Sequence, residues 1–386
     1  MLKTIEFIKQ NENWRELLST APYNLHINED DNYALLKYNQ IDSDFNQEIC
    51  KECRGLVIDK NTYEPVALSF YKFFNVQEEF ADTIDWESAK VLEKVDGSKM
   101  MVWYDDYADK WRVSTSSQLD ALNAPVADFG ITFKDLFDRA LLNYIFPNNK
   151  TLYENLNKNI CYTFELVTPE SRVVVPYKKD ALYLIGARDV NSFEELDPNI
   201  LDISKFFKVP KQFNLSNLKE CLNKVEHMSY DEEGFVVVDK YWKRVKIKSP
   251  AYVSAHYLKN NGVNSRSRIL SIIEKNEQSE FLGLFPEYTD LFNEIETKYK
   301  DIKQQMLDAI ADVQYLRREW ASNENPRKTM ATYINENHKN ISGTLFRFLD
   351  TDLIKYFVET EWSKLSKDKK MSLLGYKEVE ETNGNN

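Results

Sequence analysis

The stretch "LEKVDGSKM", residues 92–100, places Lys94 two positions before an Asp-Gly pair and between two apolar runs that predict strands. A glycine accepts positive φ and allows a sharp reversal of the chain. The lysine at the end of the first strand would then face back into a cleft, where its amine is a candidate nucleophile. Taken alone, the pattern also fits a lysine on an ordinary surface loop.

Further charged residues lie within or at the ends of other predicted strands: Arg54, Lys72, Glu165, Glu233, Lys246 and Lys248. Lys246 and Lys248 alternate with Ile247, so both cations face the same side of a strand. Solvent-facing positions of a half-exposed sheet normally carry charges as well. Together, however, these residues describe cations and carboxylates that converge on one lysine.

The first 250 residues are dominated by short runs rich in Val, Tyr, Phe and Ile, among them "PVALSFYKFFN" (65–75), "CYTFELV" (161–167), "RVVVPY" (172–177) and "EGFVVVD" (233–239). Asp, Asn, Gly and Pro separate these runs, which predicts strands. Helical patterns interrupt them, most clearly "TFKDLFDRALLNYI", with Thr132 as N-cap. Strands and helices do not alternate one for one, so we expect an antiparallel α+β domain.

After about residue 255 the period changes. Apolar residues recur at spacings of three and four from Phe292 to Trp320, which predicts one long amphipathic helix. Shorter helical patterns near 265–277 and 343–365 supply partners for its apolar face. We therefore expect two domains, residues 1–252 and a helical domain of residues 253–386.

Composition narrows the class of protein. The 386 residues are 42% hydrophobic, contain four cysteines and carry a net charge of −12. The chain shows no run of about 18 apolar residues and no signal peptide, and it has few cysteines, so we expect a soluble cytoplasmic protein with no membrane partner. Because the chain is acidic, a nucleic acid must be held by local clusters such as "YWKRVKIKS" at 241–249.

Four segments in order, "KVDGS", "TFELVTPESRVVVPY", "EGFVVV" and "VKIKS", resemble motifs I, III, IV and V of the covalent nucleotidyltransferases, which include polynucleotide ligases and mRNA capping enzymes. "YNQIDSDFNQEICKECRGLVID", "YKFFN" and "KIKSPAYVSAH" are similar to the type 1 family of bacteriophage ATP-dependent RNA ligases, which are associated with tRNA repair. The resemblance covers roughly residues 30–260. It implies an antiparallel-sheet nucleotidyltransferase (ATP-grasp-like ligase) domain followed by a small all-α C-terminal domain that helps to choose the RNA.

The resemblance implies the reaction. Lys94 would attack the α-phosphate of ATP, expel pyrophosphate and hold AMP; the AMP would pass to an RNA 5′-phosphate, and a 3′-hydroxyl would displace it. A free lysine has a pKa of about 10.4, and neighbouring cations would favour its neutral, nucleophilic form. Mg²⁺, or Mn²⁺ in its place, would assist. The partners would be RNA ends, cleaved tRNA among them, and the protein would act as a monomer in the cytoplasm, that of the host if a phage encodes it.

The resemblance also implies roles for individual residues. Lys246 and Lys248 would contact the α-phosphate, Glu165 would hydrogen-bond the ribose, and Glu233 would serve the metal-assisted chemistry. The remaining residues that the resemblance assigns to ATP are Tyr38, Arg54, Lys72, Asp96, Gly97 and Tyr252. Glu280 is the expected second metal ligand, beside Glu233.

One segment departs from the family. Its usual Ser-Lys-Gly-Ser is replaced by Ser114-Thr115-Ser116-Ser117, so that a basic contact is missing. Either Arg112 substitutes, or one of the three steps is handled differently. A nucleotide- or RNA-binding protein that has lost turnover therefore stays an alternative. A DNA ligase or capping enzyme is another, but those commonly carry an OB-fold after motif V, which would require several strands beyond residue 250.

Overall fold

The computed structural model of the protein describes residues 2–126, 129–147, 150–258, 266–283, 285–320, 322, 325–349 and 355–376. Internal contacts divide the chain into two compact units, Met1–Asn260 with Ser279–Leu284 and Asn261–Gln278 with Phe285–Asn386. No helix within the described ranges is long and apolar enough to span a membrane.

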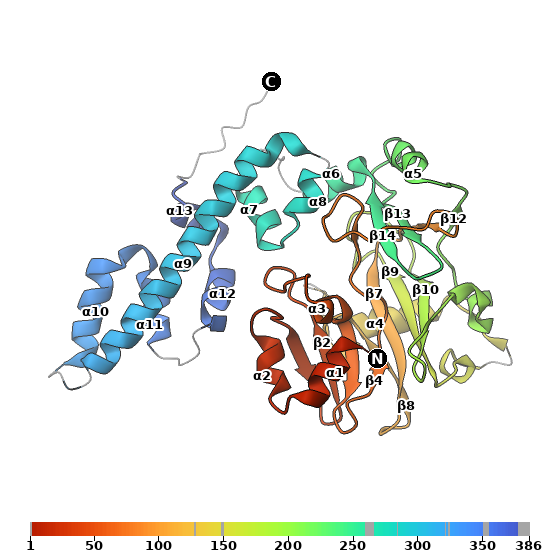
Figure 1. Cartoon of the computed structure of the whole chain (residues 1–386), viewed down its shortest axis with the longest axis horizontal. Helices are drawn as coiled ribbons and strands as arrows, with labels where there is room; N and C mark the ends of the chain where they lie inside the picture. Colours follow the sequence, from red (N-terminus) through yellow and green to blue (C-terminus); the bar gives the residue numbers. More distant parts are fainter. Residues whose placement is uncertain are drawn as a thin grey trace. The chain divides into compact units, whose positions relative to one another are not determined.

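The first unit contains three sheets (Figure 1). The N-terminal sheet consists of β1 (His26–Glu29), β2 (Tyr33–Lys37), β3 (Arg54–Asp59) and β4 (Pro65–Ala67), in that order. The central sheet has the order β11 (Glu195–Leu196), β10 (Ala181–Asp189), β9 (Ile160–Val167), β7 (Ser98–Asp105) and β8 (Lys110–Ser114). The third sheet has the order β12 (Gln212–Phe213), β6 (Lys90–Glu93), β13 (Gly234–Val238), β14 (Arg244–Lys248) and β5 (Phe74–Asn75). Apart from the parallel pair of β14 with β5, the strands described are paired antiparallel, which confirms the predicted α+β class.

Helices of the first unit cover these sheets. Helix α4 (Phe133–Leu141) begins at Thr132, whose side chain accepts a hydrogen bond from the amide of Asp135 while the Asp135 carboxylate accepts one from the amide of Thr132. This capping box confirms the predicted helix start. The other helices are α1 (Lys3–Gln10), α2 (Trp14–Ser19), α3 (Glu48–Glu52), α5 (Leu218–Val225), α6 (Pro250–Leu258) and α8 (Gln278–Leu282), with short 3-10 turns at Ala121–Asn123, Tyr153–Asn155, Pro198–Ile200 and Asp202–Lys205.

The second unit is built around the predicted long helix, α9 (Thr289–Glu319). Its buried residues Phe292, Ile295, Tyr299, Ile302, Met306, Ile310 and Val313 follow the spacing of three and four read from the sequence. The surrounding helices are α7 (Arg266–Glu274), α10 (Pro326–Asn337), α11 (Ser342–Phe348), α12 (Lys355–Lys364) and α13 (Lys367–Leu373), with 3-10 turns at Pro286–Tyr288 and Lys339–Ile341. The helical character predicted for this part of the chain is confirmed for the residues described.

One predicted strand is wrong, and another is wrong in part. The run 172–177 forms no strand, because the amides of Val174 and Val175 bind a side chain, that of Asp96, instead of a neighbouring strand. The run 65–75 is split into β4 and β5, and between them the amide of Lys72 donates to the carbonyl of Lys51. In both cases the residues have β propensity, but their backbone groups are bonded outside a ladder.

Lys94 lies where the chain crosses from one sheet to another. Strand β6 belongs to the third sheet and β7 to the central sheet, so the Asp-Gly pair does not close a hairpin between them. Gly97 does not adopt the expected positive φ. Glycine is required here because two segments approach each other closely: a Cβ at this position would lie 2.5 Å from the carbonyl oxygen of Leu166 on β9. A side chain here would therefore push the crossing away from the central sheet.

The crossing is anchored by the buried carboxylate of Asp96. One oxygen accepts hydrogen bonds from the amides of Val174 and Val175 at 2.9 and 2.7 Å, and the other accepts one from the Tyr252 hydroxyl at 2.8 Å. Burial beside Asp96 also raises the pKa of Tyr252, so its hydroxyl stays a donor. Asp96 thus joins the crossing to the segment after β9 and to helix α6.

We expect Asp96→Ala to lower the free energy of unfolding by roughly 3–5 kcal/mol, because two amides and a hydroxyl lose their charged acceptor. Tyr252→Phe removes one of the three bonds and should cost about 2 kcal/mol. Denaturant unfolding followed by circular dichroism checks both values. An Asp96→Ala protein as stable as the wild type would contradict the anchoring role.

Candidate active site

A cavity of about 320 Å³ in the first unit collects most of the predicted site. Lys94 lines it together with several other residues predicted from the sequence: Arg54, Gly97, Glu165, Lys246 and Lys248. They come from all three sheets, on β3, the crossing before β7, β9 and β14. The convergence of cations and carboxylates on Lys94 is therefore present in the structure.

Lys94 is held by Glu233. Because β13 pairs with β6, with Phe235 opposite Glu93, the Lys94 amide donates to the carbonyl of Gly234 at 2.9 Å. This pairing brings the Lys94 amine to 2.8 Å from Oε2 of the buried Glu233 carboxylate. Gly234 has φ +132°, and a Cβ on it would lie 2.1 Å from the Ile247 carbonyl oxygen, so only glycine fits at this point.

Lys246 and Lys248 face the cavity from one side of β14, as their alternation predicts. The Lys248 amine lies 3.4 Å from the second oxygen of Glu233 and also forms an ion pair with Glu280. Burial, and then the charge of Lys248, lower the pKa of Lys246 to about 7. Burial alone would raise the pKa of Glu280, but Lys248 and Lys246 lower it to about 2.

Arg54 presents an unsatisfied donor to this region. Its guanidinium lies over the ring of Phe73, 4.7 Å from the ring centre. Its Nη1 is buried, and no hydrogen-bond acceptor among the described residues reaches it. A buried cationic N–H without an acceptor is costly, and the charge of an anion in the cavity would offset part of that cost.

Glu165 and Lys99 lie opposite each other on β9 and β7. Burial raises the pKa of Glu165 to about 7, although Lys94 opposes this shift. Lys99 also lines the cavity; its amine donates to the Arg54 carbonyl at 2.9 Å and to the Ser69 hydroxyl. Burial, reinforced by Arg54, lowers the pKa of Lys99.

Two cations that line the cavity, Lys99 and Arg244, were not selected from the sequence. The available signal was the one used for Lys72: a cation next to or within an apolar run predicted to be a strand. For Arg244 the alternation already applied to Lys246 and Lys248 extends one step earlier along β14.

Six predicted residues are not among those that line the cavity: Tyr38, Lys72, Asp96, Glu233, Tyr252 and Glu280. Asp96 and Tyr252 are hydrogen-bonded to each other at the crossing between β6 and β7. The Lys72 amine lies 5.0 Å from the ring centre of Tyr38 and donates to Gln40 at 3.3 Å. Burial, followed by the charge of Arg54, lowers the pKa of Lys72 to about 8.

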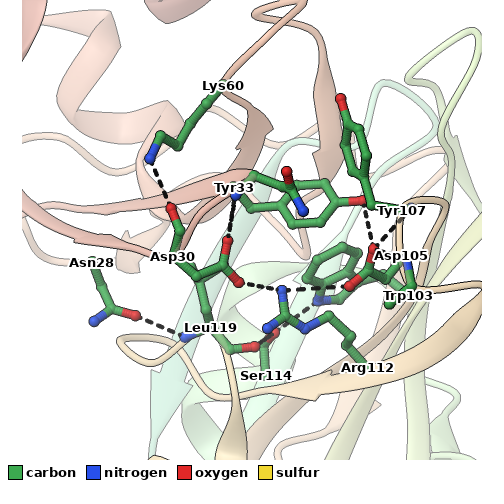
Figure 2. Close-up of polar contacts among 12 residues, drawn as sticks. Asn28, Asp30, Tyr33, Lys60, Trp103, Asp105, Tyr107, Arg112, Ser114 and Leu119 are labelled. Atoms are coloured by element: carbon green, nitrogen blue, oxygen red, sulfur yellow. Dashed lines mark hydrogen bonds and ion pairs between the residues drawn. The ribbon is translucent and has the colours of Figure 1, made fainter.

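Arg112 does not supply the missing basic contact. Figure 2 shows its guanidinium between Asp30 and Asp105, with Nη1 to carboxylate distances of 2.6 and 3.7 Å. It also lies over the Trp103 ring, 5.3 Å from the centre, and Tyr33 donates to Asp105 at 3.0 Å. This network joins the N-terminal and central sheets, so Arg112 stabilises the fold and does not face the Lys94 cavity.

The segment Ser114–Ser117 nevertheless lies at the site. A Cβ on Gly55, which has φ +83°, would lie 3.2 Å from the carbonyl oxygen of Ser116, so the segment packs against the residue after Arg54. Thr115, Ser116 and Lys99 line a separate hollow of about 410 Å³. Lys99 therefore contributes to both this hollow and the Lys94 cavity.

The two carboxylates predicted to bind a metal both lie next to Lys248. Glu233 is shared by Lys94 and Lys248, while Glu280, on α8, belongs to the first unit and is the ion-pair partner of Lys248. Within the described ranges, no group of three or more His, Cys, Asp or Glu side chains is placed to hold a metal ion. A divalent ion that kept its waters and bridged phosphates would need only one or two of these carboxylates.

The solved structures that match the chain include RNA ligases, with TM-scores below 0.5. An archaeal ATP-dependent RNA ligase (form 2) superposes with a TM-score of 0.44 and 12% identity, covering 78% of this chain and 82% of that chain. The Naegleria gruberi RNA ligase with PPi gives a TM-score of 0.33 and 18% identity, covering 44% of this chain and 52% of that chain.

Two relatives are similar in sequence. A protein of Autographa californica nuclear polyhedrosis virus, whose name joins polynucleotide kinase and RNA ligase, is 30% identical over 267 residues, or 65% of this chain and 37% of the viral protein. The RNA ligase of Rhodothermus phage RM378 is 27% identical over 329 residues, or 66% of this chain and 74% of the phage protein. The chain thus spans little more than a third of the first relative.

The family model described as RNA ligase matches residues 52–252, just over half of the chain. The matched segment contains Arg54, Lys94, Glu165, Glu233 and the cations of β14, which are the residues gathered in and around the cavity. The chain belongs to the RNA ligase family.

Proposed function

We propose that the protein is an ATP-dependent RNA ligase, which joins an RNA 5′-phosphate to a 3′-hydroxyl through a covalent lysyl-AMP and an adenylylated RNA end. The observation that carries the proposal is the Lys94 amine in a cavity that five further cations line, among them Arg54, whose Nη1 has no hydrogen-bond acceptor among the described residues. Membership of the RNA ligase family supports the same reaction.

In the first step a bond forms between Nζ of Lys94 and the α-phosphorus of ATP, and the bond to pyrophosphate breaks. The RNA 5′-phosphate then attacks the same phosphorus and frees Lys94. Finally the RNA 3′-hydroxyl attacks the 5′-phosphate and AMP leaves. Before the first attack, the Lys94 amine must leave its 2.8 Å contact with Glu233 and lose a proton.

The cations of the cavity would stabilise the charge that develops on the α-phosphate. Lys246, Lys248 and Arg54 line the space that the phosphate would fill, and in a partly desolvated cavity their charges act with little screening. Glu165 would accept a hydrogen bond from the ribose. Lys72 and Tyr38 would orient the nucleotide from the adjoining part of the site. Lys72 is close enough to Arg54 and Lys248 for their charges to lower its pKa.

A divalent ion, Mg²⁺ or Mn²⁺, would neutralise part of the phosphate charge when bound. Glu233 is the carboxylate nearest to Lys94, so it is the residue that would hold the ion. Glu280 would serve as a second ligand only on leaving Lys248. The ion would keep most of its waters.

A DNA ligase or capping enzyme is less well supported. The described residues after β14 form helices and 3-10 turns, with no strand that would belong to an OB-fold. Within the proposal the substrate is broken single-stranded RNA, cleaved tRNA among it, sealed by a monomer in the cytoplasm, that of a host cell if a phage encodes the chain. The family match and the phage relative support this reading.

Lys94→Ala should abolish transfer of label from [α-³²P]ATP to the protein, since no other amine replaces its nucleophile. Lys90→Ala is the matched control: it removes a lysine of β6, the strand just before Lys94, that pairs with Asp197 and does not line the cavity, and labelling should persist. Denaturing electrophoresis gives the readout, and circular dichroism verifies folding. Labelled Lys94→Ala protein would disprove the assignment.

Affinity for a nonhydrolysable ATP analogue should fall as the pH rises. Lys246, with a pKa of about 7 in the free protein, loses its charge above that pH, and phosphate binding favours the charged form. The dissociation constant should increase by up to about tenfold per pH unit between about pH 7 and pH 9.

Lys246→Arg keeps its charge over this range and should flatten the profile, as measured by calorimetry. Because Glu165 also titrates near pH 7, Glu165→Gln is measured in parallel to separate its contribution. An unchanged slope in Lys246→Arg would show that Lys246 is not the titrating contact.

A further inference from the structure

A further hollow, of about 520 Å³, adjoins the Lys94 cavity. Phe73 and Arg244 line both spaces, so the two hollows share walls. Its other conspicuous residues are Tyr71, Arg188, Tyr241 and Trp242. None of these four was selected for the nucleotide site, and we refer to this space as the aromatic hollow.

Aromatic rings at the aromatic hollow are exposed. Tyr71 is 44%, Tyr241 64% and Trp242 36% exposed. Trp242 has φ +63°, a left-handed conformation that is unfavourable for a bulky residue. The buried carboxylate of Asp239 holds the turn by accepting hydrogen bonds from the amides of Tyr241 and Lys243 at 2.9 and 3.1 Å. The turn between β13 and β14 is thus fixed in a form that keeps two large rings in solvent.

Arginines back these rings. Arg188 and Arg244 both pair with the partly buried Glu195, and their guanidinium carbons lie 5.4 Å from the Tyr71 ring centre and 5.5 Å from the Trp242 ring centre, respectively. Arg188 is 95% buried, and its Nε has no hydrogen-bond acceptor among the described residues. The two guanidinium groups therefore place positive charge behind the exposed rings, where it favours a ligand that carries negative charge.

The charge of the aromatic hollow indicates the kind of ligand. Its cations are Lys72, Arg188, Lys243 and Arg244, and its carboxylates are Asp82, Glu194 and Glu195. Glu195 is neutralised by two arginines, and Asp82 accepts from the backbone amide of Arg244. The hollow thus has four cations and three carboxylates, and its exposed rings stand beside its cations. Aromatic rings next to cationic side chains are the combination with which proteins bind single-stranded nucleic acid.

We propose that the aromatic hollow binds the terminal bases of a single-stranded RNA end, stacked on Tyr241 and Trp242, and so leads that end to Lys94. The proposal rests on the proposed ligase function for the identity of the strand. Stacking on aromatic rings accepts any base, so the subsite would hold RNA ends without selecting their sequence. The hollow would act after lysyl-AMP has formed, because that step requires no RNA.

The test compares Tyr241→Ala/Trp242→Ala with Tyr241→Phe/Trp242→Phe, which keeps flat rings. Tyr230→Ala serves as a matched control, since Tyr230 is 53% exposed in the same unit but does not line the hollow. Labelling by [α-³²P]ATP should stay within about twofold of the wild type in all three proteins. For the alanine pair, the KM for single-stranded RNA in sealing should rise about tenfold or more, and the phenylalanine pair should recover most of the loss.

Separate titrations of the 5′-phosphate strand and the 3′-hydroxyl strand show which end occupies the aromatic hollow; a rise in KM for either supports the proposal. Unchanged KM values for both strands in the alanine pair, or an equal rise in Tyr230→Ala, would overturn it. Anisotropy of labelled RNA is measured alongside and needs no turnover. If the wild type takes no label, the ligase function fails, and the alanine pair's RNA affinity still decides whether the hollow binds RNA.

Discussion

The buried carboxylate of Asp96 is the contact on which the geometry of the cavity depends. It binds the amides of Val174 and Val175 and the hydroxyl of Tyr252, and it stands two residues after Lys94. Its partners come from the segment after β9 and from α6, so a single side chain ties two parts of the chain to the crossing between two sheets. With Asp96 fixed and Gly97 pressed against β9, the backbone of Lys94 has little freedom, and its amine meets Glu233.

The cavity concentrates positive charge in an acidic protein. Lys94, Lys246, Lys248 and Arg54 line it, whereas the whole chain has a net charge of −12. Glu233 and Glu280 compensate part of this charge, but Lys246 still has a lowered pKa and Arg54 an unsatisfied N–H. An incompletely compensated cluster of this kind is stabilised by a bound anion, which is the electrostatic property that a nucleotide phosphate site requires.

Local sequence patterns predicted those features of the fold and the site that depend on residues close together in the chain. The alternation of Lys246 and Lys248, the Thr132 cap and the period of α9 all appear in the structure as expected. The contact of Lys94 with Glu233 joins residues 139 positions apart and needs the pairing of β6 with β13, which no local pattern specifies. The family resemblance implied that Glu233 serves the metal-assisted chemistry, but it did not predict this contact. Gly97 was expected to allow a positive φ. The structure shows instead that a side chain at this position would clash with β9.

Cations in apolar strands show why the remainder could not be predicted. Lys99 on β7 and Arg112 on β8 have similar local sequences, yet Lys99 lines the cavity while Arg112 closes a network between sheets. The difference lies in which layer covers each face, and that is a tertiary property.

For the same reason, the residues of the basic cluster 241–249 lie in two different places. On β14, Arg244, Lys246 and Lys248 alternate toward the cavity, whereas Tyr241 and Trp242 stand in the preceding turn at the aromatic hollow. Because one hairpin of β13 and β14 carries both groups, the spacing between stacked bases and reacting phosphate would be set by the rise of a single strand. A rigid spacer of this kind aligns an RNA end with Lys94 at little entropic cost, since no loop has to be ordered when the strand binds.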